Sequence, residues 1–521
     1  MTNNNDRPGF WARFRATLGV LASISAKDVR TAGEFMKLVY PDESPILRLL
    51  KFAGWSAKLV WWRMPDALQN VTIDRDISTV PYWQTALNPL ANHPWAADPG
   101  ATLPNEADAV VIGAGFGGSS VAYHWSKHAE GAMVILDSRD PAVGSAGRNG
   151  GHVVMAGGAY HGHYAYRSIY KHLPEVRPEL SDGERSAVAS QFADAYVRAL
   201  HASHESIRET IESESIDCDY VRKGQLHIAD EGDSKEVETA LRLADRLGHD
   251  DYRRLTPEAV TSLGGAATNF DGALSAGGGT WHPAKWVWGI TTAAIAKGNV
   301  RLYCRTAVLG VERRGDDYLV RTDRGDIRTR NVVNATDSHT QHLFANWLDM
   351  YPDRRLVWPY RVQGIYVEAG PPKMPTGLGI ITGLGFFAKV PDGGAVFGTD
   401  HSPVQPGAAG RSEPSRFVTK FMCAEMSDLW GRPPIRVTHE WTGTVGVAPD
   451  WYPVVGPMDG RRLYILSSFC GSGSAASFNA GEHIVFQMLG KDCEPEYHSP
   501  EFFSPMRFTD PAKYGPQRIS T

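Results

Sequence analysis

The segment VVIGAGFGG, residues 110–118, carries three glycines in the spacing GxGxxG. In such a turn Gly113 permits the tight bend, Gly115 lets the backbone approach a pyrophosphate, and Gly118 lets the next helix pack closely on the strand. The N–H groups and the dipole at the start of that helix favour the negative charge of a phosphate. The spacing therefore predicts phosphate binding at a strand-to-helix turn.

A carboxylate follows at the distance that a nucleotide site requires. Asp137 comes directly after the apolar run MVIL and lies nineteen residues after Gly118. At the end of a second strand, such a carboxylate can accept hydrogen bonds from ribose hydroxyls. An ordinary strand–turn–helix unit would explain the glycines but not this acid. We therefore expect a dinucleotide site, although the motif alone does not separate NAD from FAD.

Three further segments favour FAD. GSAGRNGGH (144–152) begins where an NAD-binding domain would place its next helix, and its Arg148 can face phosphate. NVVNATDSHT (331–340) is a strand followed by small residues that let a backbone pass close to a ligand. PDWYPVVG (449–456) precedes FCGSGSAASFNAG (469–481), a second glycine turn that opens a second helix. A long cofactor held by both ends of a domain fits FAD better than NAD.

Three residues are candidates for catalysis: His282, Trp441 and Ser472. His282, in TWHPAKW, precedes a predicted helix, so it can face a substrate or cap that helix, and both interpretations stay open. Trp441 fits a packing or cofactor-wall residue better than a catalyst. Three other histidines, His152, His161 and His163, have no Cys or carboxylate at ligand spacing, so we expect no metal there.

Composition limits the classes of function. The chain has 521 residues, 42% hydrophobic and 21% charged, which is ordinary for a globular enzyme with more than one lobe. A formal net charge of −5 argues against a nucleic-acid partner. Five scattered cysteines without a CxxC pair suit a reducing compartment, so we expect a cytoplasmic protein. Residues 7–27, with three arginines and no acid, leave an organelle-targeted protein as an alternative.

The elements that would position these residues follow from hydrophobic periodicity. Residues 108–137 read as strand, glycine turn, helix and strand, and residues 180–250 read as mainly helical. Short β-branched runs between 300 and 335 predict a hairpin meander, and residues 355–400 alternate as strands do. The strand LYILSSF (463–469) runs into the second glycine turn and its helix.

Seven motifs in order resemble the D-amino-acid oxidase superfamily of FAD-dependent oxidoreductases, from about 106 to about 495. They are VVIGAGFGG, GSAGRNGGH, TWHPAKW, RTAVLGV, NVVNATDSHT, WTGTVGVAPDWYPVVG and FCGSGSAAS. The GRNGG element is similar to the branch that contains gamma-glutamylputrescine oxidase. The resemblance implies a mixed α/β fold with a discontinuous, Rossmann-like FAD-binding domain and a mixed β-sheet substrate domain. The FAD-binding domain would take 106–155, 276–342 and 431–495, the substrate domain 156–275 and 343–430, a helical extension 1–105, and a tail 496–521.

The same resemblance assigns the site residues. The ADP half of FAD would lie on Gly113, Gly115, Gly118 and Asp137, with Phe116 and Ser138 beside them. Arg148, Asn149 and Gly150 would follow the pyrophosphate and flavin, and Val308 would contact the adenine side. Gly471, Ser472 and Gly473 would approach the flavin ring. The implied chemistry removes a hydride from a carbon next to nitrogen and passes the electrons to oxygen or another acceptor. The resulting imine is hydrolysed by water.

Departures from the family's patterns bear on the substrate. Ser472 and Ala475 stand where sarcosine oxidases have a His and a Lys, and Val445 stands where amino-acid oxidases place a carboxylate-binding Arg. A carboxylate without such a cation in a dry pocket costs several kcal/mol. We therefore expect an amine substrate, or an amino compound whose carboxylate lies away from the flavin. Gly443 replaces the Cys of sarcosine oxidases, so we expect FAD to be noncovalent. The alternatives are a 2-hydroxy-acid dehydrogenase that reduces a quinone and a flavin-binding protein with a partner-docking leader.

Residues 46–62, ILRLLKFAGWSAKLVWW, are predicted to form an amphipathic helix. Its apolar side would carry Ile46, Leu47, Leu50, Ala53, Ala57, Val60 and Trp61, and its polar side Arg48, Lys51 and Lys58. We expect the apolar side to pack on the catalytic body or on a second subunit of a homo-oligomer. The alternative is peripheral membrane contact, because tryptophans suit the headgroup region and cations suit anionic lipid.

Overall fold

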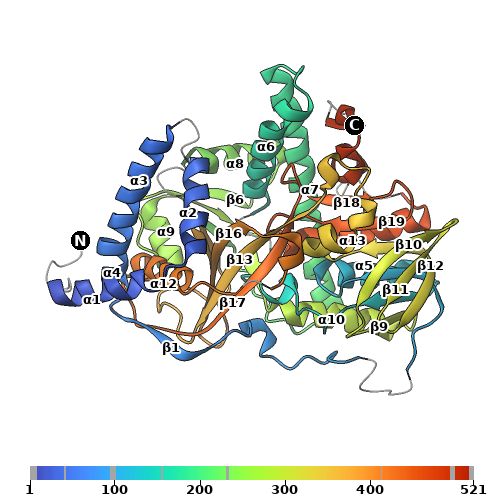
Figure 1. Cartoon of the computed structure of the whole chain (residues 1–521), viewed down its shortest axis with the longest axis horizontal. Coiled ribbons are helices and arrows are strands. Elements are labelled where there is room, and N and C mark those ends of the chain that lie inside the picture. The colour runs from blue at the N-terminus through green and yellow to red at the C-terminus, as the bar shows by residue number, and fades with distance from the viewer. Residues whose placement is uncertain are drawn as a thin grey trace.

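The computed structural model describes residues 9–39, 43–93, 101–153, 157–229, 234–411, 413–492 and 499–514. Two large β-sheets, one of eight strands and one of nine, organise these residues (Figure 1). No helix within the described ranges is long and apolar enough to cross a membrane.

The eight-stranded sheet has a parallel centre. Its order is β10 (Val308–Arg314), β11 (Asp317–Thr322), β12 (Gly325–Asn334), β2 (Glu106–Ile112), β3 (Met133–Leu136) and β9 (Val300–Tyr303), while β19 (Leu463–Ser467) pairs with β12 and with β18 (Val454–Pro457). The strands β12, β2, β3 and β9 run parallel, and β10–β12 form the predicted antiparallel meander. Burial on both faces explains why runs such as MVIL are continuously apolar.

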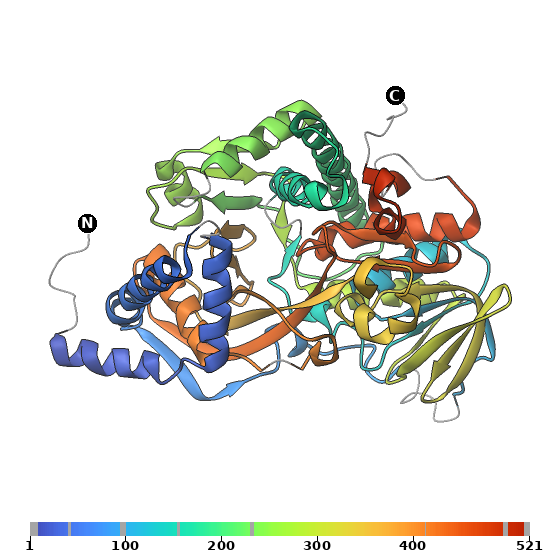
Figure 2. The ribbon, with the colours of Figure 1, turned by 45° about the horizontal axis from the view of Figure 1, so that its top comes forward.

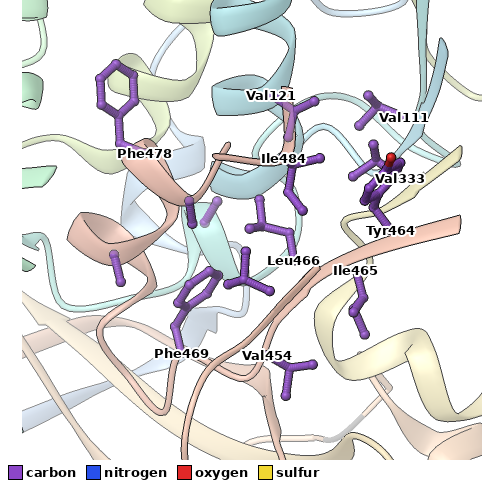
Figure 3. Packing of buried hydrophobic residues seen from close by; sticks show 14 of the residues in the cluster. Val111, Val121, Val333, Val454, Tyr464, Ile465, Leu466, Phe469, Phe478 and Ile484 are labelled. Atoms are coloured by element: carbon purple, nitrogen blue, oxygen red, sulfur yellow. The ribbon is translucent and has the colours of Figure 1, made fainter. Parts of the chain in front are cut away.

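Three helices pack with this sheet: α5 (Phe116–His128), α10 (Pro283–Ala296) and α13 (Gly473–Leu489). Figure 3 shows part of the core that they share with the strands, in which Val121, Leu466 and Ile484 lie close together. A strand, a glycine turn and α5 follow in the predicted order. The Rossmann-like arrangement expected from the sequence is therefore confirmed.

The nine-stranded sheet is mixed. Its order is β1 (Val71–Ser78), β17 (Ile435–Val447), β13 (Trp358–Val367), β16 (Ala395–Pro403), β15 (Gly385–Lys389), β14 (Gly379–Thr382), β5 (Gln225–Ile228), β7 (Gly272–Ser275) and β6 (Tyr252–Leu255). Its helices are α6 (Gly157–Val176), α7 (Asp182–Ser213), α8 (Ser234–Leu247), α9 (Pro257–Gly264) and α12 (Arg416–Trp430). The short strands β4 (His152–Val153) and β8 (Gly279–Thr280) pair with each other.

The topology divides the chain differently from the sequence at one place. The sequence assigns 431–495 to the FAD-binding domain, but β17, within this range, pairs with β13 along its length and so lies within the nine-stranded sheet. The described part of the C-terminal tail packs on the body. Arg507, 1% exposed, donates from Nε to Asp450 Oδ2 at 2.8 Å, and Tyr514 donates to the same oxygen at 2.9 Å.

The first hundred residues are not only helical. The helices α1 (Phe10–Leu21), α2 (Ala26–Val39), α3 (Pro45–Ala57) and α4 (Met64–Ala67), with a π-helical turn over Lys58–Arg63, lead into strand β1. This strand is parallel to β17 and forms the edge of the nine-stranded sheet. Its sequence, VTIDRDIS, begins with β-branched residues, which fit a pleated edge better than a helix.

The predicted helix over 46–62 forms, but most of its apolar side does not pack. Only its end is buried, where Leu59 and Val60 join a cluster that includes Val20, Met64 and Ala424 of α12. In α3 itself no described side chain is buried. The expectation that the apolar face packs on the body therefore holds for the π-helical turn and is wrong for α3.

Candidate functional site

The glycine turn between β2 and α5 leaves room for a ligand at its centre. Gly113 has φ of +106°, and a Cβ there would lie 2.7 Å from the carbonyl oxygen of Ala335. A Cβ on Gly118 would lie 1.8 Å from the carbonyl oxygen of Gly113, so helix and strand require glycine at this contact. At Gly115, by contrast, an added Cβ meets only the Cβ of Ala146, at 3.7 Å. The space in front of Gly115 is what a pyrophosphate would need.

The start of α5 supplies suitable donors for that anion. Its N-cap is Gly115, which has no side chain to cap the helix, and its first turn contains no acidic residue. N–H groups at such a helix start carry partial positive charge. Phe116, its first residue, stacks on Trp281 with ring centroids 5.9 Å apart. The donor set fits the phosphates of a dinucleotide.

Asp137 lies at the end of β3, beside the turn. Its Oδ2 accepts a hydrogen bond from the N–H of Ala114 at 2.8 Å, and its Oδ1 accepts one from Arg139 N–H at 2.8 Å. Burial raises the pKa of this carboxyl group, and the two hydrogen bonds oppose that effect. Each oxygen keeps a lone pair that a ribose hydroxyl could use. Ser138, the next residue, is exposed.

The loop with GRNGG is held by its own side chains. Arg148 donates from Nε to the carbonyl oxygen of Val143 at 2.9 Å and from a terminal nitrogen to that of Thr442 at 2.8 Å. Asn149 donates to the carbonyl oxygens of Ser145 and Ala146. Arg148 therefore joins the loop to β17 through carbonyl groups.

Trp83 and Gln84, in the N-terminal extension, support this loop. Trp83, 2% exposed, donates from Nε1 to the carbonyl oxygen of Asn149 at 2.6 Å. Gln84 donates to the carbonyl oxygens of Val143 and Gly147 at 3.1 and 3.3 Å. The Trp83 ring also fills the space beside Gly151, where an added Cβ would lie 2.6 Å from it. Sequence analysis missed both residues.

The second glycine turn lies before α13 and has an unusual backbone. Ser468, Cys470 and Gly471 have φ of +58°, +49° and +95°, and such backbone strain concentrates at functional sites. Asp337, which sequence analysis also missed, fixes the turn by accepting from the Ser467 hydroxyl at 2.8 Å. It also accepts from the backbone N–H groups of Ser468 and Gly446.

Ser472 is the N-cap residue of α13, and Gly473 is the first residue of that helix. The hydroxyl of Ser472 is fully buried and lies within hydrogen-bonding reach of the Tyr196 hydroxyl. A buried hydroxyl keeps further donor and acceptor capacity that a ligand at the helix start could use. The turn is thus chemically suited to hold a polar edge of a cofactor.

One row of six residues on the nine-stranded sheet lies toward the GRNGG loop. The register aligns Trp441, Gly364, Gly398, Phe386, Ile381 and His227 in one row across six strands. The loop lies against this row, because Trp441 donates from Nε1 to the carbonyl oxygen of Arg148 at 2.9 Å. Phe386 touches Gly150, where an added Cβ would lie 2.3 Å from the ring. Neither Lys nor Arg, nor Asp or Glu, stands in the row.

Aromatic residues of α6 cover the far end of the row. Tyr160 lies over His227 with ring centroids 4.1 Å apart, and it packs with Ile381 and Phe386. Its hydroxyl donates to the hydroxyl of Tyr164 at 3.0 Å. Aromatic side chains of α6 therefore pack on the sheet at this end of the row.

His152, at the end of the GRNGG loop, adds a titratable group. It is 3% exposed, and its Nδ1 lies 3.0 Å from Oε1 of Gln225, whose amide nitrogen donates to the carbonyl oxygen of Gly279 at 2.7 Å. Burial lowers the pKa of the imidazole to about 4, so it is neutral at pH 7. Sequence analysis considered this residue only as a metal ligand.

The remaining predicted residues have structural partners. His282 is the N-cap of α10 and accepts from Lys285 N–H at 3.2 Å, which agrees with the capping interpretation. Burial lowers its pKa to about 4. Trp441 is fully buried and packs against Gly364, as a wall residue does. Val308 begins β10 and is half-buried.

The sequence predicts no metal site at His152, His161 and His163. Among the described residues, one group of three brings possible ligand atoms within 4.8 Å of one another: His124, His128 and Glu482. It lies between α5 and α13. The Glu482 carboxylate lies 2.9 Å from His128 Nε2 and 3.4 Å from His124 Nδ1, so the group also reads as a hydrogen-bonded network.

Comparison with solved structures agrees with this fold. L-amino acid deaminase from Proteus vulgaris superposes with a TM-score of 0.59 at 21% identity, over 78% of this chain and 95% of that one. Glycine oxidase from Geobacillus kaustophilus superposes with a TM-score of 0.61 at 16% identity, over 78% and 99%. At these identities the likeness concerns the fold.

Sequence comparison covers the same region. The chain is 21% identical over 412 residues to the probable oxidoreductase OrdL of Haemophilus influenzae, covering 76% of this chain and 85% of that protein. It is 25% identical over 292 residues to D-amino acid dehydrogenase 3 of Mesorhizobium japonicum, covering 50% and 67%. Residues 108–487 match the family described as FAD dependent oxidoreductase (DAO). The chain therefore belongs to this family of FAD-dependent oxidoreductases.

Proposed function

We propose that the enzyme oxidises a C–N bond of an amine, or of an amino compound whose carboxylate lies away from the reacting carbon, to an imine. The observation that carries this proposal is the uncharged row on the nine-stranded sheet, which runs from Trp441 to His227. The structures of relatives named for amino acid substrates support chemistry at nitrogen.

The row supports an amine because it offers no cation to a carboxylate. Val445, two residues beyond Gly443 on the same face of β17, lies opposite Tyr360 of β13. The nearest cation of the loop, Arg148, already donates to two carbonyl oxygens. A buried carboxylate without a charged partner would cost several kcal/mol, whereas a neutral amine is tolerated among aromatic rings.

Within this proposal FAD lies along the two glycine turns and the GRNGG loop. Gly115 and the start of α5 would hold the pyrophosphate, Asp137 the ribose, and Ser472 the polar edge of the flavin. Bound FAD supplies the hydride acceptor. We propose that its attachment is noncovalent, because burial raises the pKa of the Cys470 thiol to about 12 and keeps it protonated.

His152 is the proposed proton acceptor. A substrate ammonium must lose a proton before its carbon can release a hydride, and the neutral imidazole beside Gly150, which also contacts Gln225 and the backbone of Phe387, is the group we propose to take that proton. Because its pKa is lowered to about 4, the imidazole stays neutral above about pH 5. Its contribution to activity should therefore be lost only as pH falls toward 4.

The test is an anaerobic screen of the holoenzyme with amines, α-amino acids and 2-hydroxy acids, read as bleaching of the flavin absorption band. Bleaching by amines supports the proposal. Bleaching only by 2-hydroxy acids would replace it with the dehydrogenase alternative, and no bleaching by any class would favour a flavin-binding protein without turnover.

A His152→Gln variant tests the proton acceptor separately. Glutamine keeps a polar side chain but cannot accept the proton, so the rate of flavin reduction at pH 7 should fall about 100-fold or more. His342→Gln, at an exposed position on the short helix α11 (Thr340–Leu343), is the matched control and should reduce as the wild type does. Equal rates in the His152 variant and the wild type would remove His152 from the mechanism.

A further inference from the structure

Most of the exposed large apolar side chains lie in the N-terminal extension, residues 1–105, which we call the leader. Of the twenty large apolar side chains that are exposed among the described residues, twelve lie between Phe10 and Trp62. Trp11 is 71% exposed, Ile46 73% and Leu50 64%. Scattered exposed apolar residues need no explanation, whereas a concentration in one segment marks an interaction surface.

Part of this surface is a continuous aromatic cluster. Phe10 contacts Trp11, Phe14 and Trp61, with ring centroids 5.4 to 6.4 Å apart. Trp62, 57% exposed, receives the guanidinium of Arg13 over its ring at 4.9 Å. The cluster joins α1 to the π-helical turn that follows α3, so the exposed surface runs across both segments. We call the exposed apolar side chains of α1, α3 and this turn the leader surface.

The orientation of α3 is the reverse of that in an ordinary surface helix. Its polar residues Arg48 and Lys51 are half-buried on the side toward the protein, and Lys51 forms an ion pair with Glu43 at 2.5 Å. Its apolar residues Ile46 and Leu50 face outward. A helix normally buries its apolar stripe. Here the cations are held inward and the stripe is presented to the surroundings.

Charge sets the leader apart from the body as well. Residues 1–67 contain ten Lys or Arg and six Asp or Glu, a net charge of +4, while the whole chain carries −5. The remaining residues therefore carry −9. Neither α1 nor α3 contains an acidic residue, and Arg15 and Lys58 are exposed on or next to these helices.

The helices of the leader surface lie at one end of the molecule. Both views place α1 and α3 at the end opposite β9–β12 of the eight-stranded sheet (Figures 1 and 2). The surface is thus remote from the glycine turn that opens α5. It can be covered without blocking that turn.

We propose that the leader surface docks the enzyme on an anionic lipid bilayer, with α1 and α3 lying in the plane of the interface. Apolar and aromatic side chains would enter the headgroup region, where tryptophan is favoured, and the exposed cations Arg15 and Lys58 would meet lipid phosphates. A second copy of the chain fits less well. In a symmetric pairing the same cations would face one another with no acid from either helix to match them.

The test is flotation of the full-length holoenzyme with vesicles of phosphatidylcholine alone or of phosphatidylcholine with phosphatidylglycerol. We expect binding to the anionic vesicles that weakens as salt is raised. The variant Trp11→Ser/Ile46→Ser/Leu50→Ser should lose about tenfold or more of that binding. Because all three side chains are exposed, its melting temperature and flavin absorbance should match the wild type.

A matched control changes three exposed apolar residues outside the leader, Phe270→Ser/Met350→Ser/Leu384→Ser, and should float as the wild type does. Wild-type protein that stays in the soluble fraction, or a leader variant that binds undiminished, would overturn the proposal. Sedimentation of the wild type and the leader variant measures their oligomeric states. A wild type that is dimeric and a leader variant that is monomeric would assign the surface to a second copy of the chain instead.

Discussion

The glycine turns and the leader both leave atoms uncovered, but of opposite kinds. Around Gly115 the uncovered groups are backbone donors in a confined space, and near Ser472 the polar group is a buried hydroxyl. Along α1 and α3 the uncovered groups are large apolar side chains at the periphery. Confined polar groups fit a cofactor such as FAD, and a peripheral apolar surface fits an extended partner. The two regions therefore call for different experiments.

The largest effect is expected from removing the leader altogether. Deleting residues 1–100 takes away β1, which covers the edge of β17, and also Trp83 and Gln84, which support the GRNGG loop. We expect insoluble, flavin-free protein, because an uncovered strand edge and an uncovered α12 promote aggregation. Solubility and flavin content after purification measure this. A soluble, yellow truncated protein would show that residues 1–100 are not needed for solubility or for FAD binding.

The next effect concerns the glycine turn alone. Gly115→Val should abolish FAD binding, because its side chain would occupy the space that the pyrophosphate needs. The apoprotein should still fold, since an added Cβ meets only Ala146, at 3.7 Å. Gly183→Val, in the open first turn of α7, is the control. Full flavin absorbance in the Gly115 variant would mean that the site is misplaced.

The cofactor turns were predictable because their signals are local. The spacing of Gly113, Gly115 and Gly118 and the position of Asp137 are read from thirty residues of sequence, and the fold confirms the strand–turn–helix that they predict. The supports of the site were not predictable in this way. Trp83 is 66 residues from its partner Asn149, and no pattern near either residue joins them.

The leader shows a different limit of sequence reasoning. Periodicity correctly predicts that residues 46–62 are helical and amphipathic, but it does not say which side faces the protein. Tertiary contacts decide that, and here Leu59 and Val60 are buried against Ala424 of α12 while the apolar side of α3 itself stays exposed. Strand β1 was missed because the surrounding helices dominated the interpretation of the segment.

A smaller effect tests the support that the leader gives to the cofactor loop. Trp83→Ala should lower the free energy of unfolding by about 3–5 kcal/mol, since a large buried ring is lost, and should weaken FAD retention. Trp83→Phe keeps most of the ring and loses the hydrogen bond to Asn149, at a cost of about 1 kcal/mol. Urea denaturation and the flavin-to-protein ratio measure both. Unchanged flavin retention in the Ala variant would show that Trp83 does not contribute to FAD binding.

The smallest effect concerns the ionic contact between leader and body. Arg63 pairs with Glu425 at 2.7 Å and with Asp428 at 2.8 Å, and burial raises the pKa of the Glu425 carboxyl group. Arg63→Met should cost about 1–2 kcal/mol of unfolding free energy, because Arg63 is partly exposed and Glu425 can take up a proton. Adding Glu425→Gln should recover part of the loss. No recovery would mean that the contact acts through packing alone.

The central claim is that the uncharged row beside the GRNGG loop selects an amine over an amino acid. It is tested most directly by anaerobic flavin reduction with a matched pair, 2-phenylethylamine and phenylalanine, in wild type and in Val445→Arg. The account predicts faster reduction by the amine in the wild type and a shift of preference toward phenylalanine in the variant, which supplies a cation for the carboxylate. Faster reduction of the wild type by phenylalanine would contradict it.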